Sequence, residues 1–337
     1  MTRAQYINLG RSGLKVSRLI LGTWYLPTLP ELDSYGVRRI NEEATLRLWR
    51  KAVDMGVNTI DTANRYHGAI APVPVTHVGY VERLLGRFLK TVDRDSLVIA
   101  TKVRFRMGNG PNDEGLSRKH ILKAVKDSLE RLQTGYIDLY QAHGPDPSTP
   151  LEETMRTLDY LVKEDLVHYV GCSNFQAWMV SEALAVSQRL GLVEFVSVQP
   201  LYNMLQRDAE KELFPLVREK GLGVICYSPL AQGLLAGRYL GGRAQDARAS
   251  YSPSVNPLLT ERNLQIVEQL AVMAKEKGVT LAQLSLAWLL HQPEVTAPII
   301  GATKPEQLEE NLQALEVKLS AEDLKRIDEI LERHPQQ

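Results

Sequence analysis

The chain has 337 residues, of which 44% are hydrophobic and 24% charged, an ordinary globular composition that excludes a disordered or collagen-like chain. The 40 Lys and Arg residues balance the 40 Asp and Glu residues, which excludes the broad basic surface of a protein that binds nucleic acid or anionic lipid. No stretch approaches the roughly 18 apolar residues that span a bilayer, and the N-terminus lacks the apolar segment of a secretory signal. We therefore expect a cytoplasmic protein that binds neither nucleic acid nor membranes.

Short apolar runs alternate with amphipathic segments along the chain. The first segment, YINLGRSGLKVSRLI, predicts a β-hairpin that turns at Gly10–Gly13 and closes the N-terminal end of a barrel. Eight strand and helix pairs follow. The predicted strands are Leu19–Thr23, Val57–Asp61, Leu97–Lys102, Tyr136–His143, Val167–Gly171, Phe195–Gln199, Gly223–Tyr227 and Ala297–Gly301. The predicted helices lie near Glu43–Met55, Val81–Lys90, Arg118–Gln133, Leu151–Glu164, Gln176–Leu190, Ala209–Lys220, Glu261–Glu276 with Leu281–Leu290, and Glu306–Leu315.

The strands indicate a fold of the α/β class. Runs such as SLVIATK and GVICYS are almost continuously apolar, as in parallel strands that are covered on both faces. Eight such units fit a closed (β/α)₈ TIM barrel, a single domain over residues 1–337. The alternative, an open doubly wound sheet, is disfavoured because GTWYLPTLP follows the first strand where GxGxxG would be expected. Long loops at His67–Tyr80 and Ser228–Thr260 are expected on the C-terminal face of the barrel.

Four polar side chains lie at or just after the ends of consecutive predicted strands. Asp61 ends the second strand, with Tyr66 in the following loop, Lys102 ends the third and His143 ends the fourth. A nearby ammonium lowers the pKa of a phenol, and a buried ammonium needs a counter-ion such as Asp61. An imidazole such as that of His143 can orient a substrate oxygen by a hydrogen bond, or share proton transfer with the phenol. The arrangement therefore predicts a proton donor and an oxyanion clamp for a carbonyl group.

Other interpretations of these residues stay open. Asp61 and Lys102 can form a purely structural ion pair, or Lys102 can act as the Schiff-base nucleophile of a lyase. Cys172 and Cys226 lack metal-ligand spacing, and we expect both to be buried. Two loop histidines, His67 and His77, lack a third ligand, and no metal site is expected.

Seven motifs resemble, in this order, those of the aldo-keto reductases: DTANRY, TK, YIDLYQAHGPD, GCSNF, SVQPLYN, YSPLAQGLLAGRY and IIGATKPEQLEEN. The resemblance extends from the Gly10 hairpin to Asn311. It implies a catalytic tetrad of Asp61, Tyr66, Lys102 and His143, with Tyr66 as general acid in carbonyl reduction and general base in alcohol oxidation. The implied reaction is reversible hydride transfer from NADPH to an aldehyde or ketone, such as a sugar or another small carbonyl compound.

The resemblance also implies a nicotinamide cofactor bound in extended form without a Rossmann domain. Ser173, Asn174 and Gln199 would hold its carboxamide, and Tyr227 would stack on its ring. The implied pyrophosphate loop contains Ser228, Leu230, Gln232 and Gly233. Arg238 is a candidate charge partner for the pyrophosphate, with an arginine that is only solvated as the alternative. Thr303, Lys304 and Gln307 would face the 2′-phosphate and Glu310 and Asn311 the adenine, and Thr23, Trp24 and Gly301 complete the cofactor set.

Two departures from the family pattern bear on specificity. Many NADPH-selective relatives carry an arginine where this chain has Gln307, so NADP(H) is preferred with Lys304 as the nearest cation, and NAD(H) is the alternative. The apolar insert after Tyr66, YHGAIAPVPVTHVGYVE, is expected to shape or cover the substrate site.

Trp24, Tyr25, Arg104 and Phe105 are candidates for the substrate wall, with ordinary packing as the alternative. A nucleotide-sensing or regulatory subunit with little turnover is the alternative function. No oligomeric state is predicted.

Overall fold

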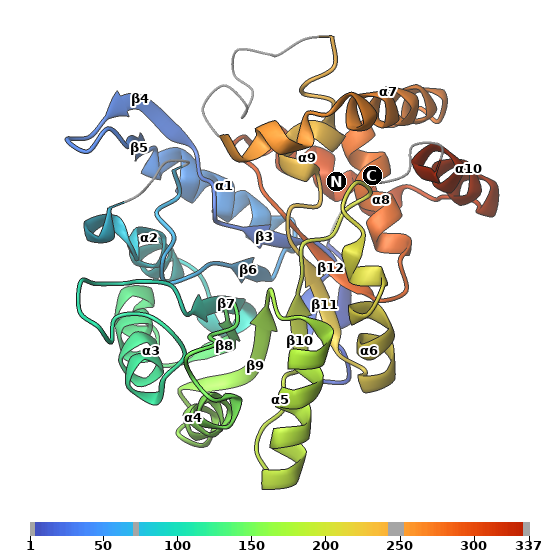
Figure 1. Ribbon diagram of the computed structural model, residues 1–337. Coiled ribbons are helices and arrows are strands. Elements are labelled where there is room, and N and C mark those ends of the chain that lie inside the picture. Colours follow the sequence, from blue (N-terminus) through green and yellow to red (C-terminus); the bar gives the residue numbers. More distant parts are fainter. Residues whose placement is uncertain (1–3, 70–73, 242–252, 333–337) are drawn as a thin grey trace.

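Eight parallel strands close into a barrel at the centre of the molecule (Figure 1). The computed structural model describes residues 4–69, 74–241 and 253–332. Around the barrel the strand order is β10, β11, β12, β3, β6, β7, β8 and β9, and the parallel pairing of β9 with β10 closes the ring. The strands are β3 (Ile20–Gly22), β6 (Thr59–Asp61), β7 (Val98–Val103), β8 (Ile137–Ala142), β9 (Val167–Ser173), β10 (Ser197–Gln199), β11 (Gly223–Cys226) and β12 (Val295–Ile300). The predicted TIM barrel is confirmed, and the open sheet is excluded. That residues 1–337 form a single domain stays a prediction.

Helices follow the strands and cover the outside of the barrel (Figure 1). They are α1 (Glu42–Asp54), α2 (Tyr80–Leu89), α3 (Arg118–Leu132), α4 (Leu151–Lys163), α5 (Ala177–Leu190), α6 (Leu213–Lys220), α7 (Glu261–Glu276), α8 (Leu281–His291), α9 (Pro305–Gln313) and α10 (Ala321–Glu332). Side-chain caps fix several helix starts: Asn41 Oδ1 accepts from Ala44 N, and Thr280 forms a reciprocal capping box with Gln283.

The helix predicted near Ala209–Lys220 is divided into the 3₁₀ turn η3 (Asp208–Glu210) and α6. Pro215 accounts for the division, because proline has no N–H and is tolerated only in the first turn of a helix. In α6 it is the third residue, whereas a helix that began at Ala209 would carry it in the interior.

The inside of the barrel changes from apolar to polar along the strands. Val98 and Ala100 of β7 and Leu139 of β8 belong to an apolar cluster inside the barrel. Successive side chains of a strand point to opposite faces, so Lys102 and Gln141 share the inner face with these residues. Both are fully buried and lie opposite each other in the parallel pairing of β7 with β8. The fold therefore gathers polar groups at the C-terminal ends of the strands.

The N-terminal hairpin closes the other end of the barrel, as predicted. Its strands are β1 (Tyr6–Asn8) and β2 (Lys15–Ser17), and Leu9 and Val16 are buried in the apolar cluster inside the barrel. Gly10 has φ +58°, and a Cβ there would lie 2.5 Å from the backbone nitrogen of Gly223. Only glycine combines this backbone conformation with so close an approach. The turn is thereby fixed against the start of β11.

A second hairpin, β4 (Thr28–Leu32) with β5 (Arg38–Ile40), follows the first barrel strand and was not predicted. Its turn is organised by Asp33, whose Oδ1 accepts from the backbone N–H groups of Tyr35 and Val37, and by Gly36 at φ +74°. In Figure 1 it lies at the edge of the molecule, beside α1.

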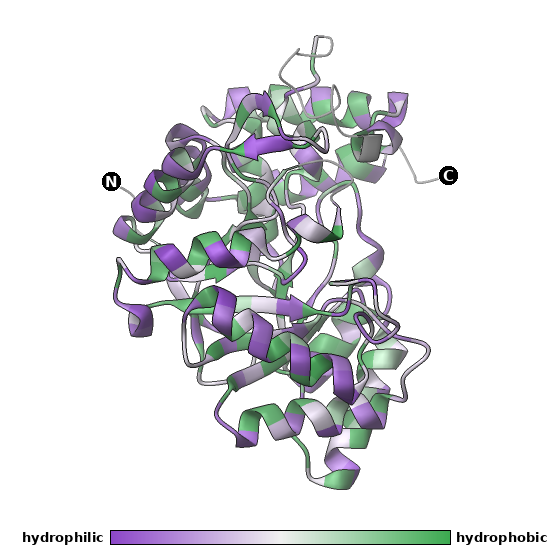
Figure 2. Cartoon of the chain, turned by 90° about the vertical axis from the view of Figure 1, so that its left-hand side faces the viewer, coloured by the Kyte–Doolittle hydropathy of each residue, from purple (hydrophilic) through white to green (hydrophobic). Residues whose placement is uncertain are grey.

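The larger hydrophobic core lies between the barrel and the helices. Hydrophobic and hydrophilic residues alternate along the helices in Figure 2, as expected for elements with one face on the core. Cys172 and Cys226 are buried, as predicted, and both are free thiols. In the described parts of the chain, no helix is both long and apolar enough to cross a membrane.

Candidate active site

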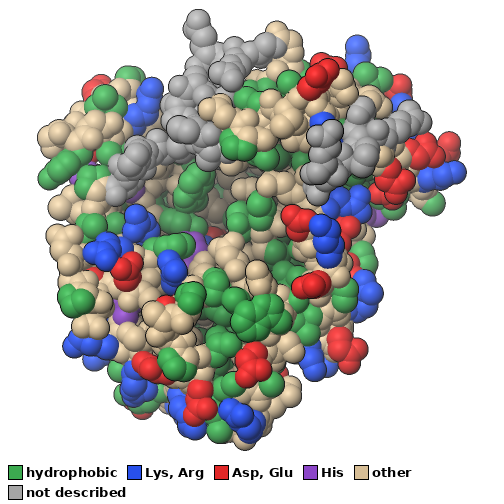
Figure 3. All heavy atoms as spheres, viewed as in Figure 1, with side chains coloured by type: hydrophobic (Ala, Val, Ile, Leu, Met, Phe, Trp, Pro, Cys, Tyr) green, Lys and Arg blue, Asp and Glu red, His purple; other side chains and the backbone are tan. Residues whose placement is uncertain are grey.

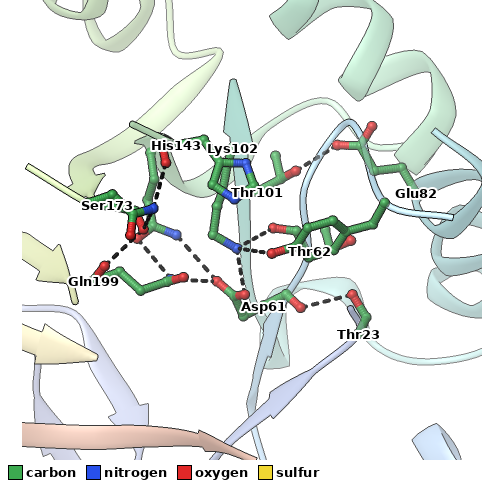
Figure 4. A network of polar contacts seen from close by, with 12 residues as sticks. Thr23, Asp61, Thr62, Glu82, Thr101, Lys102, His143, Ser173 and Gln199 are labelled. Atoms are coloured by element: carbon green, nitrogen blue, oxygen red, sulfur yellow. Dashed lines mark hydrogen bonds and ion pairs between the residues drawn. The ribbon is translucent and has the colours of Figure 1, made fainter. Parts of the chain in front are cut away.

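A buried ion pair lies among the polar groups at the C-terminal ends of the barrel strands, which we call the polar layer. Lys102 Nζ is 2.6 Å from Asp61 Oδ1, and the two side chains are 0% and 4% exposed (Figure 4). Asp61 ends β6 and Lys102 lies near the end of the neighbouring strand β7, so strand pairing brings them together. Removal of two charges from water is costly, and such a pair persists only with close contacts. The predicted pairing is present.

Lys102 also joins the ion pair to Tyr66. Its Nζ donates to the backbone oxygen of Thr62 at 2.8 Å and to the hydroxyl of Tyr66 at 3.4 Å. Burial would lower the pKa of Lys102, but Asp61 and Tyr66 raise it above its usual value. Lys102 is therefore a charged ammonium with its three N–H groups directed at three oxygen atoms.

Tyr66 is a neutral phenol at physiological pH. Burial raises its pKa, and the Lys102 ammonium opposes this rise without overcoming it. The expectation that Lys102 lowers the pKa of Tyr66 thus describes one contribution, while the net shift is upward. The proton of Tyr66 is in place, as a proton donor requires.

His143 follows the last residue of β8 and faces the same space. Its ring centroid lies 5.7 Å from that of Tyr66 and 4.8 Å from that of Phe105. Burial lowers the pKa of His143 well below its usual value, and the charges of Lys102 and Arg104 act in the same direction. Its buried Nδ1 has no hydrogen-bond partner within the described residues. His143 is therefore a neutral imidazole with an unused polar atom.

The structure adds Gln141 to the predicted residues. Its Nε2 donates to Asp61 Oδ2 at 3.3 Å, and its Oε1 accepts from Gln199 Nε2, also at 3.3 Å. Gln199 Nε2 donates to Asp61 Oδ2 at 2.9 Å (Figure 4). The sequence carried a signal for Gln141, because this polar residue lies two positions before His143, on the same face of an apolar strand.

The residues that the resemblance assigns to the carboxamide and to the nicotinamide ring form one series of hydrogen bonds at the ends of β9, β10 and β11. Ser173 Oγ donates to the backbone oxygen of Gln199 at 2.8 Å, and Asn174 Nδ2 donates to Ser173 Oγ and to the backbone oxygen of His143. Tyr227 OH donates to Asn174 Oδ1 at 2.9 Å. Asn174 takes a left-handed conformation with φ +61°. This series of hydrogen bonds links the residues to the polar layer.

The segment assigned to the pyrophosphate follows β11. Ser228, Ala231, Gln232 and Gly233 all have positive φ, and the 3₁₀ segment η4 (Ala231–Ala236) begins after Leu230. Within this segment the backbone N–H groups of Ala231 and Gly233 donate to the backbone oxygen atoms of Ser228 and Leu230. Arg238 is exposed, and its Cδ lies 3.0 Å from where a Cβ of Gly233 would be.

The segment assigned to the adenosine phosphate runs from the end of β12 into α9. Thr303 donates to Gln307 Oε1 through both its backbone nitrogen and its hydroxyl. Lys304 is exposed at the N-cap of α9, and within the described chain it forms no ion pair. Gly301 is exposed and Asn311 buried, with Glu310 between these extremes.

The candidates for the substrate wall lie in different surroundings. Trp24 is 47% exposed, Tyr25 pairs with Gly68 in an isolated bridge, and Arg104 Nε donates to the backbone oxygen of Pro145 at 3.2 Å. Thr23 joins the ends of β3 and β6 through two hydrogen bonds to the backbone oxygen of Asp61. The face shown in Figure 3 has a hollow with hydrophobic side chains beside it.

The insert after Tyr66 packs against the β4–β5 hairpin. His77 Nε2 lies 2.5 Å from Asp33 Oδ2, and the buried Nδ1 of His67 has no partner in the described structure. These residues line a cavity of about 580 Å³ together with Tyr80 and Arg83. Residues 70–73 of the insert lie outside the described residues. The described residues contain no group of three or more His, Cys, Asp or Glu side chains placed to bind a metal.

The profile of the Aldo/keto reductase family matches residues 18–332, nearly the whole chain. The chain belongs to the aldo/keto reductase family. It is therefore an oxidoreductase, as the resemblance of its motifs implied, and proteins of this family generally use NAD(P)H.

Three relatives illustrate the range of this family. A protein of Schizosaccharomyces pombe named putative voltage-gated potassium channel subunit beta is 39% identical, over 97% of this chain and 93% of that protein. One of Oryza sativa subsp. japonica named probable voltage-gated potassium channel subunit beta is 36% identical over 98% of each chain. The L-glyceraldehyde 3-phosphate reductase of Escherichia coli K12 is 36% identical, over 96% of this chain and 92% of that enzyme. This aldo/keto reductase thus has relatives named as reductases and as channel subunits.

Proposed function

We propose that this protein reduces an aldehyde or ketone with NADPH, that Tyr66 supplies the proton, and that the reverse oxidation also occurs. The observation that carries the proposal is the position of Lys102 Nζ, which lies within hydrogen-bond distance of both Asp61 Oδ1 and the Tyr66 hydroxyl. Together with the neutral His143, these groups form a proton donor with a charged neighbour. A cytoplasmic location and a small carbonyl substrate are parts of the proposal.

The residues present suit a nicotinamide cofactor. Gln199 Oε1 receives no hydrogen bond from any described residue, and it can accept from the N–H₂ of a carboxamide. When bound, the cofactor supplies the hydride that reaches the carbonyl carbon. Lys304 is a cation without an ion-pair partner in the described structure and suits a 2′-phosphate, which supports NADP(H) over NAD(H).

The proposed roles of the residues follow from their protonation states. The neutral Tyr66 donates its proton as charge develops on the substrate oxygen, and the Lys102 ammonium stabilises the phenolate left behind. Asp61 keeps Lys102 charged throughout. The neutral His143 carries one N–H, which can hydrogen-bond the same substrate oxygen and orient it toward Tyr66.

Replacement of Tyr66 by phenylalanine tests the proposal, because it removes the hydroxyl and keeps the ring beside His143. We expect kcat for NADPH-dependent reduction of an aldehyde panel to fall by a factor on the order of 10² to 10⁴. The dissociation constant of NADPH, followed by fluorescence quenching, should stay within about twofold because Tyr66 makes no proposed contact with the cofactor.

The matched control is Tyr136→Phe, which removes a hydroxyl that donates to Asp95 outside the site. Its activity should equal that of the unmodified protein. Retention of full activity by Tyr66→Phe would show that Tyr66 is not the acid.

A regulatory subunit that binds the cofactor with little turnover is the second candidate. The names of the S. pombe and rice relatives favour it. NADPH binding without oxidation by any aldehyde or ketone would support this alternative. A Schiff-base lyase is disfavoured, because Lys102 is held as an ammonium and an amine must lose its proton to attack a carbonyl.

A further inference from the structure

The carboxylate of Asp61 faces two different partners through its two oxygen atoms. Oδ1 accepts from Lys102 Nζ, whereas Oδ2 accepts from Gln199 Nε2 at 2.9 Å and from Gln141 Nε2 at 3.3 Å. Paired with an ammonium, Asp61 is ionised and can only accept hydrogen bonds. Both glutamines must therefore turn their N–H₂ groups toward it.

This constraint determines what Gln199 can offer to a ligand. Its Nε2 has two hydrogens, of which one is directed at Asp61 Oδ2 and the other at Gln141 Oε1. Its Oε1 is then turned away from Asp61 and has no donor among the described residues. An amide anchored through both hydrogens is fixed in its plane as well as in its direction, because hydrogen bonds are directional.

Gln141 supplies the second of these two anchors. It is fully buried in β8 and lies opposite Lys102 of β7 in the strand pairing. Unlike Ser173, Asn174 and Gln199, it is not among the residues that the family resemblance assigned to the cofactor.

We propose that Gln141 is a positioning residue: it holds the side-chain amide of Gln199 so that the acceptor Oε1, and not the donor Nε2, faces the cofactor, and it thereby selects the N–H₂ group of the cofactor carboxamide. This inference rests on the proposed use of a nicotinamide cofactor. It means that one carboxylate, Asp61, orients the proton donor through Lys102 and the cofactor through Gln199.

The test uses a cofactor analogue that lacks the relevant hydrogens. In the 3-acetylpyridine analogue of NADP⁺ a methyl group replaces the carboxamide N–H₂, so the analogue cannot donate to Gln199 Oε1. We expect the full-length protein to bind it about tenfold more weakly than NADP⁺, the effect of a buried acceptor left without its donor. Binding is measured by fluorescence quenching or calorimetry, without turnover.

In Gln141→Met the amide of Gln199 keeps only one anchor and can swing its oxygen aside. We expect the preference for NADP⁺ over the analogue to shrink to roughly twofold, while NADP⁺ itself binds a few-fold more weakly. A residue that serves only packing would weaken both ligands by the same factor. If Gln141→Met does not fold, Gln141→Asn, which keeps an amide but is one methylene shorter, is measured in the same way.

Ser197→Ala is the matched control. Ser197 is fully buried on β10, two residues before Gln199, and its hydroxyl has no hydrogen-bond partner within the described residues. Its variant should keep the tenfold preference. An unchanged preference in the Gln141 variants would overturn the proposal, as would equal binding of the two ligands by the unmodified protein. Either result leaves the reductase proposal intact, because that proposal is tested by turnover and fails if neither NADPH nor NADH supports reduction of any aldehyde or ketone.

Discussion

Replacement of Asp61 by asparagine tests whether the buried ion pair stabilises the fold. The substitution keeps the size of the side chain and removes the charge opposite Lys102, which is 0% exposed and cannot be solvated by water instead. The asparagine amide has only one acceptor oxygen, so it cannot accept hydrogen bonds both from Lys102 and from the two glutamines. If its oxygen faces Lys102, its N–H₂ faces the N–H₂ groups of Gln141 and Gln199, which also donate.

The expected loss is large for a single substitution. Removal of one partner of a buried ion pair costs about 3–5 kcal/mol of unfolding free energy. The unfolding entropy of 337 residues is roughly 0.7 kcal/mol/K, at about 2.1 cal/mol/K per residue. The melting temperature of Asp61→Asn should therefore fall by about 4–7 °C, measured by differential scanning calorimetry at pH 7.

The pH dependence gives a second readout of the same effect. In the unmodified protein the raised pKa of Lys102 contributes stability at neutral pH that is lost as pH rises through that pKa. In Asp61→Asn only Tyr66 still opposes burial, which is the largest effect on Lys102 and lowers its pKa, so deprotonation relieves the buried charge as pH rises. The difference in melting temperature between Asp61→Asn and the unmodified protein should therefore narrow between pH 7 and about pH 10. In the double variant with Lys102→Met, at least half of the lost stability should be restored. A melting temperature within about 1 °C of the unmodified protein, or a deficit that stays constant with pH, would refute this reasoning.

Two further predictions concern His67 and Lys304. Burial and the nearby His77 lower the pKa of His67 from 6.5 to about 4, so the unfolded chain binds this proton more readily and stability falls as pH drops through that interval. We expect the unfolding free energy in urea to be about 1 kcal/mol lower at pH 5 than at pH 7, after allowance for solvent screening. This fall in unfolding free energy should be missing from His67→Phe. If both proteins lose the same unfolding free energy between pH 7 and pH 5, His67 is not its source. Lys304→Met should weaken NADPH binding about fivefold to tenfold and leave NADH binding unchanged, by fluorescence titration, whereas equal losses for both cofactors would contradict a phosphate contact.

The barrel could be predicted from the sequence because its strands carry strong local signals. SLVIATK and GVICYS are apolar enough to be buried on both faces, and the expected strands each match an observed one with ends shifted by a few residues. Asp61, Lys102 and His143 could be placed at one end because parallel strands bring their carboxyl ends together. The pairing of Asp61 with Lys102 then followed from charge alone.

The β4–β5 hairpin and Gln141 were missed for different reasons. The hairpin strands are short, mostly exposed and contain Pro30, so they lack an apolar alternation, and only the turn residues Asp33 and Gly36 gave a signal. Gln141 was passed over because a single polar residue in an apolar strand does not show what it contacts. Its partners Asp61 and Gln199 are brought to it by barrel closure, which depends on residues far apart in the sequence.

The N-terminal hairpin also has a kinetic consequence. Leu9 and Val16 fill one end of the barrel, and the close approach of Gly10 to Gly223 leaves no passage for a ligand at that turn. Under the proposed function, the cofactor and the carbonyl substrate would both have to enter from the opposite end. Whichever of them lies deeper has to arrive first and depart last, so a compulsory order of binding would follow from the closed end rather than from any residue that touches the reactants.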